Sequence, residues 1–301
     1  MQPSNVPEST LVDDGGMIVR VRDIELRLWE GLQAAPAGDP HRIYLYKDRR
    51  FLTALAAVID RISPARMVEI GVLTGGSTIY WTERYQVQRM AAFEISPRAT
   101  LLSQYIERHG LTDRMRIHFG TRQDDVPALV SAITQDFAGE QIDVILDDAS
   151  HQYNETRTTL ETLLPYVRDG GIYVIEDWAW GHHKNWPPQM WVNQPLMSPL
   201  LSELMLVCGR GRGVIDRIDI DPNFAVIWRG PAPLPTDGTF RLTDHYVSRD
   251  FQVALPSSRR HLRQSRRAKA PISKSLRSAR DRTAGSSRDE IASRKYCHAR
   301  R

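Results

Sequence analysis

The stretch MVEIGVLTGGS at residues 67–77 decides the fold that this sequence predicts. It starts as an apolar run of strand length and turns at Gly71, Gly75 and Gly76 before a helical pattern begins near Ser77. Glycines let the backbone turn tightly and approach a ligand closely, and the first N–H groups of the next helix stay free to bind it. The spacing of the glycines is not GxGxxG, which argues against a dinucleotide-binding fold. We therefore expect a buried strand followed by a ligand-binding turn.

Strand and helix patterns alternate on both sides of this stretch, from residue 46 to residue 230. Such alternation is typical of a mostly parallel sheet with helices on both faces. The further expected strands are 89–95, 115–120, 142–148 and 172–177, and the expected helices are 51–62, 77–84, 97–110, 126–134, 155–171 and 200–207. Two last strands, 213–220 and 224–230, are joined by three residues and must be antiparallel. An α/β fold with a mostly parallel, seven-stranded sheet and an antiparallel C-terminal hairpin has the Rossmann-like outline of class I methyltransferases.

The 301 residues suffice for one large α/β domain, and we divide the chain into three parts. In residues 1–45, a polar segment precedes VRDIELRLWEGLQ, which starts at Val21 and has the spacing of an amphipathic cap helix, for example between Leu26 and Trp29. Residues 46–250 form the α/β domain. Residues 251–301 form a basic tail with few large apolar side chains, which predicts a disordered or weakly helical extension.

Charge is distributed unevenly along the chain. Residues 257–301 carry 15 Lys and Arg against 3 Asp and Glu, whereas the remainder carries 25 against 33. An acidic body offers no basic track for nucleic acid, although the basic tail can contact anionic surfaces. No apolar stretch reaches the ~18 residues of a membrane span and the start lacks a signal-peptide pattern, so we expect a cytoplasmic protein without a transmembrane segment. Cys208 and Cys297 form neither a disulfide framework nor a CxxC metal pair.

In open α/β sheets, ligands bind beyond the carboxyl ends of the strands, so the residues that close each strand are candidates for a site. Glu94 closes the second strand, 23 residues after Gly71, where a carboxylate can accept both hydroxyls of a ribose. Side chains of 120–125, after the third strand, can border an adenine. The turn and the acid together predict a nucleoside site. The alternative is a plain glycine-rich turn and a surface carboxylate beside Arg98.

Four carboxylates close the fourth and fifth strands: Asp147 and Asp148 in ILDDASHQ, and Glu176 and Asp177 in IEDW. They repel one another unless a cation lies among them, and an all-oxygen set suits Mg²⁺. The alternative is that one or two of them cap the following helices. His151 follows Asp148 by three residues, and a neutral imidazole there can take a proton from a hydroxyl whose pKa a metal has lowered. Otherwise this histidine only bonds its own loop.

A cluster of tryptophans follows these acids. Trp178, Trp180, Trp186 and Trp191 lie within fourteen residues, in a stretch that also holds Pro187 and Pro188. Two prolines exclude a buried helix there. Aromatic rings that project from a loop can stack on a sugar or on an aromatic acceptor. In the alternative, the rings pin the loop to the body of the domain.

The motifs EIGVLTGGS, FEIS, ILDDASHQ and IEDW, in this order, resemble those of metal-dependent O-methyltransferases, over roughly residues 46–230. The family comprises macrolide-sugar and rhamnosyl O-methyltransferases together with cephamycin-hydroxylase-like proteins. The resemblance implies a homo-oligomeric enzyme that uses S-adenosylmethionine and Mg²⁺ to methylate a hydroxyl of a sugar in a small molecule or glycan. It assigns cofactor binding to Glu69, Gly71, Thr74, Gly75, Ser77, Glu94, Gln123 and Asp147, magnesium binding to Asp148, Glu176 and Asp177, and the role of general base to His151. Thr121 departs from the family pattern, which has an acidic residue before the glutamine.

Other functions share some of these residues. A catechol-type O-methyltransferase uses the same combination of a metal and vicinal oxygens, and only the tryptophan-rich loop distinguishes the two acceptors. A metal-dependent hydrolase would use the carboxylates to activate water, but it has no need of Glu94 or of the glycine turn. A relative that binds the cofactor without catalysis also remains an alternative.

Overall fold

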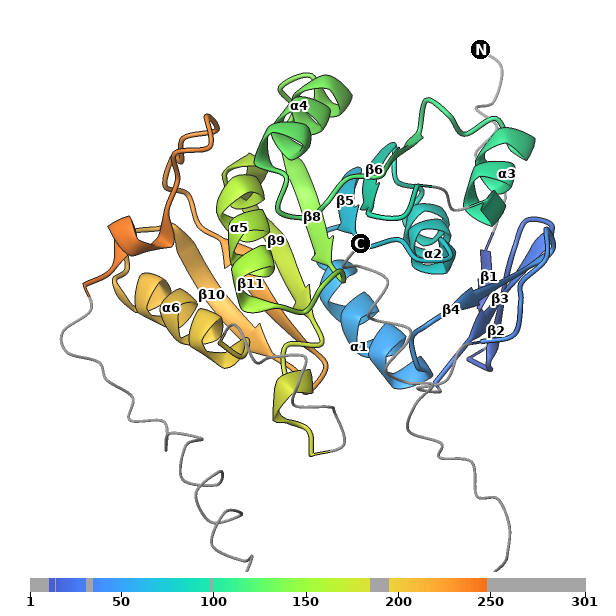
Figure 1. Ribbon diagram of the computed structural model, residues 1–301, viewed down its shortest axis with the longest axis horizontal. Helices are drawn as coiled ribbons and strands as arrows, with labels where there is room; N and C mark the ends of the chain where they lie inside the picture. The colour runs from blue at the N-terminus through green and yellow to red at the C-terminus, as the bar shows by residue number, and fades with distance from the viewer. Residues whose placement is uncertain (1–10, 14, 31–34, 98–99, 185–194, 248–301) are drawn as a thin grey trace, which may run out of the picture.

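The computed structural model describes residues 11–13, 15–30, 35–97, 100–184 and 195–247. This part of the chain contains a seven-stranded sheet with helices on both faces and a separate four-stranded sheet beside it (Figure 1). The predicted basic tail at 251–301 lies outside the described residues, as do Trp186 and Trp191. No helix among the described residues is both long and apolar enough to cross a membrane.

The large sheet has the strand order β10-β11-β9-β8-β5-β6-β7. Its five parallel strands are β5 (Arg66–Ile70), β6 (Arg89–Glu94), β7 (Met115–Phe119), β8 (Ile142–Asp147) and β9 (Val167–Glu176). The hairpin of β10 (Ile215–Ile220) and β11 (Phe224–Arg229) completes the sheet, and β11 pairs antiparallel with β9. The predicted class I methyltransferase fold is confirmed. The strand order reverses between β5 and β8, which is where ligands bind in open α/β sheets.

Helices cover both faces of this sheet because successive strand residues point to opposite sides. One apolar core contains α1 (Arg49–Ile59), α2 (Gly76–Arg84) and α3 (Thr100–Arg108), and the other contains α4 (Val126–Phe137), α5 (Tyr153–Leu163) and α6 (Ser198–Gly209). In β8, Val144 and Leu146 belong to the first core, whereas Ile145 belongs to the second. The sheet is therefore buried on both faces, and a ligand can reach it at the carboxyl ends of the strands.

One expected helix is shorter than its sequence pattern suggested. The helix predicted at 155–171 ends at Leu163, a 3-10 turn covers Leu164–Tyr166, and β9 already begins at Val167. Pro165 explains the early end because proline lacks the N–H group that a continuing helix needs. Gly170 and Gly171 therefore lie within β9 and not at a helix terminus, and Gly170 has a positive φ of 68°.

The prediction of a cap helix that starts at Val21 is wrong. The segment forms the hairpin of β2 (Ile18–Val21) and β3 (Ile24–Leu28), which joins β1 (Leu11–Asp13) and β4 (Arg42–Leu45) in a sheet of order β1-β2-β3-β4. Ile24, Leu26 and Leu28 are buried and alternate with more exposed residues, which is the period of a strand. The sheet packs into the same apolar core as α1, α2 and α3. It thereby brings the end of β4 next to the carboxyl ends of the large sheet.

Candidate functional site

A cavity of about 640 Å³ lies at the carboxyl ends of the parallel strands. Most residues that the sequence predicted for the site line this cavity: Gly71, Thr74, Ser77, Glu94, Gln123, Asp148, His151, Glu176 and Asp177. The N-terminal sheet also contributes to the lining with Trp29, Tyr44, Tyr46 and Lys47, none of which the sequence pattern identified. The cavity is therefore shared by the two sheets.

The glycine turn fits closely between its neighbours. Gly71 has a φ of 90°, and a Cβ at this position would lie 2.2 Å from the carbonyl oxygen of Asp148. Gly75, the N-cap of α2, has a φ of 89° and would place a Cβ 2.6 Å from Cβ of Leu102. Both positions require glycine because a side chain there is both strained and blocked. Thr74 adds a tie to the small sheet by donating its hydroxyl to the carbonyl oxygen of Tyr44 at 2.6 Å.

Glu94 joins the first and second strand ends through its carboxylate. Its Oε2 accepts the backbone N–H groups of Val72 at 3.0 Å and Leu73 at 2.8 Å, and its Oε1 accepts that of Ser96 at 2.8 Å. Oε2 thus accepts two bonds and Oε1 only one, so Oε1 keeps capacity for a ligand hydroxyl. The exposed side chains of Leu73 and Ile95 flank it in the cavity, and the sequence reasoning did not single them out.

Gln123 and Asp147 hold the loop that carries Asp148 and His151. The Gln123 Oε1 accepts the backbone N–H of Ser150 at 2.8 Å, and its Nε2 donates to Asp147 Oδ1 at 3.3 Å. Asp147 Oδ2 accepts the hydroxyl of Tyr173 at 2.6 Å. Burial, with a smaller contribution from Asp148, raises the pKa of Asp147 to about 7. Asp147 was predicted to bind the cofactor, but it lies behind the cavity wall and supports the loop.

Glu69 also lies behind the wall, beneath the start of α2. It is completely buried and accepts the hydroxyl of Thr78, while its Oε1 has no hydrogen-bond partner among the described residues. Burial raises its pKa to about 7. Glu69 thus holds the start of α2 from the side of the core, and Gly75 is the N-cap of the same helix. Neither residue lines the cavity.

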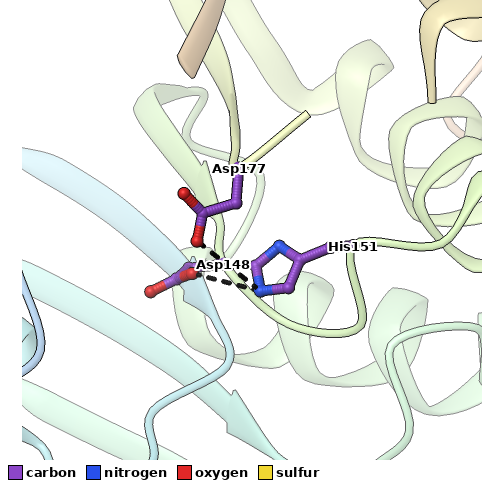
Figure 2. Close-up of side chains that lie close together, drawn as sticks. All are labelled: Asp148, His151 and Asp177. Carbon is purple, nitrogen blue, oxygen red and sulfur yellow. Dashed lines mark ion pairs between the residues drawn. The ribbon is translucent and has the colours of Figure 1, made fainter. Parts of the chain in front are cut away.

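Asp148, His151 and Asp177 converge on one point of the cavity (Figure 2). One ligand atom of each residue lies within 4.8 Å of those of the other two. The His151 Nε2 is 3.7 Å from Asp148 Oδ1 and 4.0 Å from Asp177 Oδ2. Both His151 and Asp177 have a φ of 53°, an uncommon backbone conformation for such residues. Among the predicted magnesium ligands, Asp148 and Asp177 thus lie together, with the predicted base beside them.

Lys47 links Asp148 to Glu176, the third predicted magnesium ligand. Its Nζ donates to Asp148 Oδ2 at 2.8 Å and forms a closer ion pair with Glu176 Oε2. Only 4% of the lysine side chain is exposed. Burial alone would lower the pKa of Lys47, but the two carboxylates hold it above its ordinary value. No local pattern in the sequence could reveal this lysine, because Asp148 and Glu176 are 101 and 129 residues away from it.

The carboxylate cluster, defined as Asp148, Glu176 and Asp177, fits a divalent cation. The Glu176 Oε1 is buried and has no hydrogen-bond partner in the described part of the chain. Burial and then the charge of Asp148 hold the pKa values of Glu176 and Asp177 well above their ordinary range, although Lys47 opposes this. Three acids therefore face one ammonium group, and oxygen donors of this kind suit Mg²⁺.

The tryptophan-rich segment 178–191 is described up to residue 184, and the two tryptophans in this part make different contacts. The ring of Trp180 lies 4.4 Å from that of His151 between centroids and lines the cavity. Trp178 instead donates its indole N–H to the carbonyl oxygen of Asp221 at 2.9 Å, which fixes the loop to the β10–β11 connection. The interpretation that a ring pins the loop to the domain thus holds for Trp178, whereas stacking of Trp180 on an acceptor stays a prediction.

Comparisons with known proteins give the following similarities. A family model described as a methyltransferase domain matches residues 68–178. The 8-demethyl-8-(2-methoxy-alpha-L-rhamnosyl)-tetracenomycin-C 3'-O-methyltransferase of Streptomyces olivaceus is 30% identical over 39% of this chain and 28% of its own length. The L-olivosyl-oleandolide 3-O-methyltransferase of Streptomyces antibioticus is 31% identical over 41% of this chain and 30% of its own.

Among solved structures, the MycE methyltransferase of the mycinamycin biosynthetic pathway, in complex with Mg, SAH and mycinamycin VI, has a TM-score of 0.49 and 24% identity. This match covers 62% of this chain and 52% of that chain. The chain spans less than a third of the length of the two curated relatives named above.

Proposed function

We propose that this chain is an S-adenosylmethionine-dependent O-methyltransferase that uses Mg²⁺ and acts on a sugar hydroxyl, because a model described as a methyltransferase domain matches residues 68–178. One observation carries the proposal: the bound carboxylate of Glu94 and the cluster of Asp148, His151 and Asp177 line the same cavity. The names of both curated relatives, a rhamnosyl and an olivosyl O-methyltransferase, support the sugar as acceptor class.

In this proposal, the cofactor binds at the end of the cavity formed by the glycine turn and Glu94. The carboxylate accepts a ribose hydroxyl at Oε1, which bonds only one backbone N–H, that of Ser96, and so has an acceptor position left. The apolar side chains of Leu73 and Ile95 offer surfaces for the adenine ring. The sulfonium group supplies the activated methyl, so the protein has to supply position and a deprotonated acceptor oxygen.

Asp148, Glu176 and Asp177 would hold the magnesium ion. When bound, Mg²⁺ supplies a Lewis acid that lowers the pKa of an acceptor hydroxyl and orients neighbouring oxygens. The preference of Mg²⁺ for oxygen leaves the imidazole of His151 beside the metal site as a base. Burial lowers the pKa of His151, which keeps the ring neutral near pH 7.

The backbone sets the tautomer that this role needs. The His151 Nδ1 lies 3.4 Å from the carbonyl oxygen of Glu176, and only a protonated Nδ1 can donate there. The Nε2, which faces Asp148 and Asp177, then carries the lone pair. It would take the hydroxyl proton of the acceptor, and the cofactor would supply the methyl group to that oxygen and leave as S-adenosylhomocysteine. The Trp180 ring, packed on the imidazole, shields this proton transfer from water and offers a face for the sugar.

The test combines binding with turnover. Calorimetric titration of S-adenosylmethionine and S-adenosylhomocysteine into the full chain, with Mg²⁺ or with EDTA, should give micromolar-range binding. Rhamnosylated, olivosylated and catechol acceptors are then offered with Mg²⁺, and methylated products are identified by mass spectrometry. We expect transfer to the sugar acceptors only, and EDTA should abolish it. Absence of cofactor binding in both conditions would overturn the proposed methyltransferase activity. Methyl transfer to the catechol alone would overturn the proposal that the acceptor is a sugar.

Three further expectations stay predictions under this proposal. They are the cytoplasmic location, the homo-oligomeric assembly and the contact of the basic tail with anionic surfaces. The division of the chain at residues 45 and 250 also stays a prediction. Each is compatible with the proposed chemistry, which needs only the cavity between the two sheets.

A further inference from the structure

We propose that Lys47 is the resident counter-cation of the carboxylate cluster and competes with the divalent metal ion for Asp148 and Glu176. The inference rests on the proposed function, because it concerns the magnesium ion of that same site. It adds a residue from outside the matched methyltransferase domain, which begins at residue 68.

The contacts of Lys47 carry the first step. Its ammonium group bonds Oδ2 of Asp148, which directly follows β8, and Oε2 of Glu176, which ends the neighbouring strand β9. The other oxygens of the same two acids are differently placed: Asp148 Oδ1 faces His151, and Glu176 Oε1 has no hydrogen-bond partner among the described residues. The lysine thus satisfies half of each carboxylate and leaves the other half available.

The position of Lys47 in the fold carries the second step. Its backbone N–H donates to the carbonyl oxygen of Leu45 at 2.9 Å, directly after β4. The next residue, Asp48, caps α1 by accepting the backbone N–H of Phe51 at 2.6 Å. The ammonium lies 4.8 Å from the centroid of the Phe51 ring, which favours a cation at this place. The chain on both sides is therefore fixed, and the small sheet presents the ammonium to the acids.

The charges carry the third step. With Lys47 in place, the three acids and the ammonium have a net charge of −2 when all are ionised, and without it the charge becomes −3. A divalent cation is attracted more strongly by the larger negative charge, and this effect is large where water is scarce. The ammonium and the metal also need the same carboxylate oxygens. Removal of Lys47 should consequently tighten metal binding, whereas a lysine that only ties the two sheets together would have no such effect.

The experiment measures Mn²⁺ binding to the full chain by electron paramagnetic resonance of the free ion, without cofactor or acceptor. Lys47→Met removes the charge and keeps the length of the side chain, and Lys47→Arg keeps the charge. Arg168→Met is the matched control. Arg168 forms an ion pair with the buried Asp143, with Nε 2.6 Å from Oδ1, and neither residue lines the cavity. We expect Lys47→Met to bind Mn²⁺ about tenfold more tightly than wild type, and the other two variants to bind as wild type does.

Thermal unfolding gives a second readout that a purely structural role would not change. Lys47→Met should lose stability in EDTA and gain more from added Mg²⁺ than wild type gains, whereas Arg168→Met should lose stability equally in both. Unchanged or weaker Mn²⁺ binding by Lys47→Met would overturn the inference and leave the proposed function intact. Failure of wild type itself to bind Mn²⁺ would overturn both.

A third measurement needs no variant and covers the case in which Lys47→Met does not fold. Wild-type crystals with Mn²⁺ bound should show the lysine Nζ beyond hydrogen-bond distance of Asp148, of Glu176 or of both. If Nζ keeps both ion pairs while Mn²⁺ occupies the cluster, the lysine is not a competitor and the inference is wrong.

Discussion

The two ends of the cavity are built on opposite electrostatic principles. At the nucleoside end, three backbone N–H groups donate hydrogen bonds to the carboxylate of Glu94. At the metal end, Asp148, Glu176 and Asp177 face one another with a single lysine between them, and Glu176 Oε1 stays without a partner among the described residues. The first end is complete as folded. At the second end, the proposed metal ion would supply the additional positive charge.

The largest expected effect comes from the metal end, where His151→Ala removes the proposed base. We expect kcat to fall by ~10²–10⁴-fold, the usual contribution of general base catalysis, with the affinity for S-adenosylmethionine unchanged. Steady-state kinetics and calorimetry measure the two quantities. His109→Ala is the control, since His109 pairs with Asp23 at 2.7 Å and does not line the cavity. Equal turnover in His151→Ala and wild type would remove the histidine from the mechanism.

A smaller effect is expected at the nucleoside end. Glu94→Gln keeps the size of the side chain but replaces one acceptor oxygen with a donor, which opposes a backbone N–H and weakens the ribose contact. The cofactor affinity should fall by about 30–100-fold, which corresponds to roughly 2–3 kcal/mol. Calorimetry measures this change, and Mn²⁺ binding should stay as in wild type.

The control for this variant is Glu140→Gln, an exposed carboxylate that is 3.5 Å from Arg66 and outside the cavity. If Glu94→Gln weakens Mn²⁺ binding as much as cofactor binding, the two ends are not independent. The contrast between them would then not hold.

The fold followed from the sequence wherever strands are buried on both faces. Short, mostly apolar segments such as 142–147 predict buried strands, and all five parallel strands were found within a few residues of their bounds, apart from the start of β9. The small sheet was missed because Leu26 and Trp29 have a helical spacing, although Ile24, Leu26 and Leu28 have the spacing of a strand. Pairing with β4, which no local pattern encodes, decides between the two.

The site followed from the rule that ligands bind at strand ends, but the rule does not say which side chains face the ligand. Asp147 and Asp148 are adjacent in the sequence, yet Asp147 points to Tyr173 inside the core and Asp148 points into the cavity. Lys47 belongs to a segment that sequence reasoning treated as a boundary between parts of the chain. Its role depends on tertiary contacts alone, so only the structure reveals it.

The smallest effect tests an exception at the nucleoside end, where Glu69 is buried beneath the turn with a pKa of about 7. Its ordinary value is 4.5, so the folded state binds this proton more tightly than the unfolded state does. The stability that the proton contributes is therefore complete below pH 4.5 and is lost as the pH rises through 7. Glu69→Gln imitates the protonated acid and should remove this loss, which amounts to roughly 3 kcal/mol of unfolding free energy. Denaturant titrations in EDTA at several pH values measure it, with Glu140→Gln as control. If the unfolding free energies of wild type and Glu69→Gln change in parallel as the pH rises, Glu69 is ionised in the folded state. A second negative charge would then lie beneath the turn at the nucleoside end.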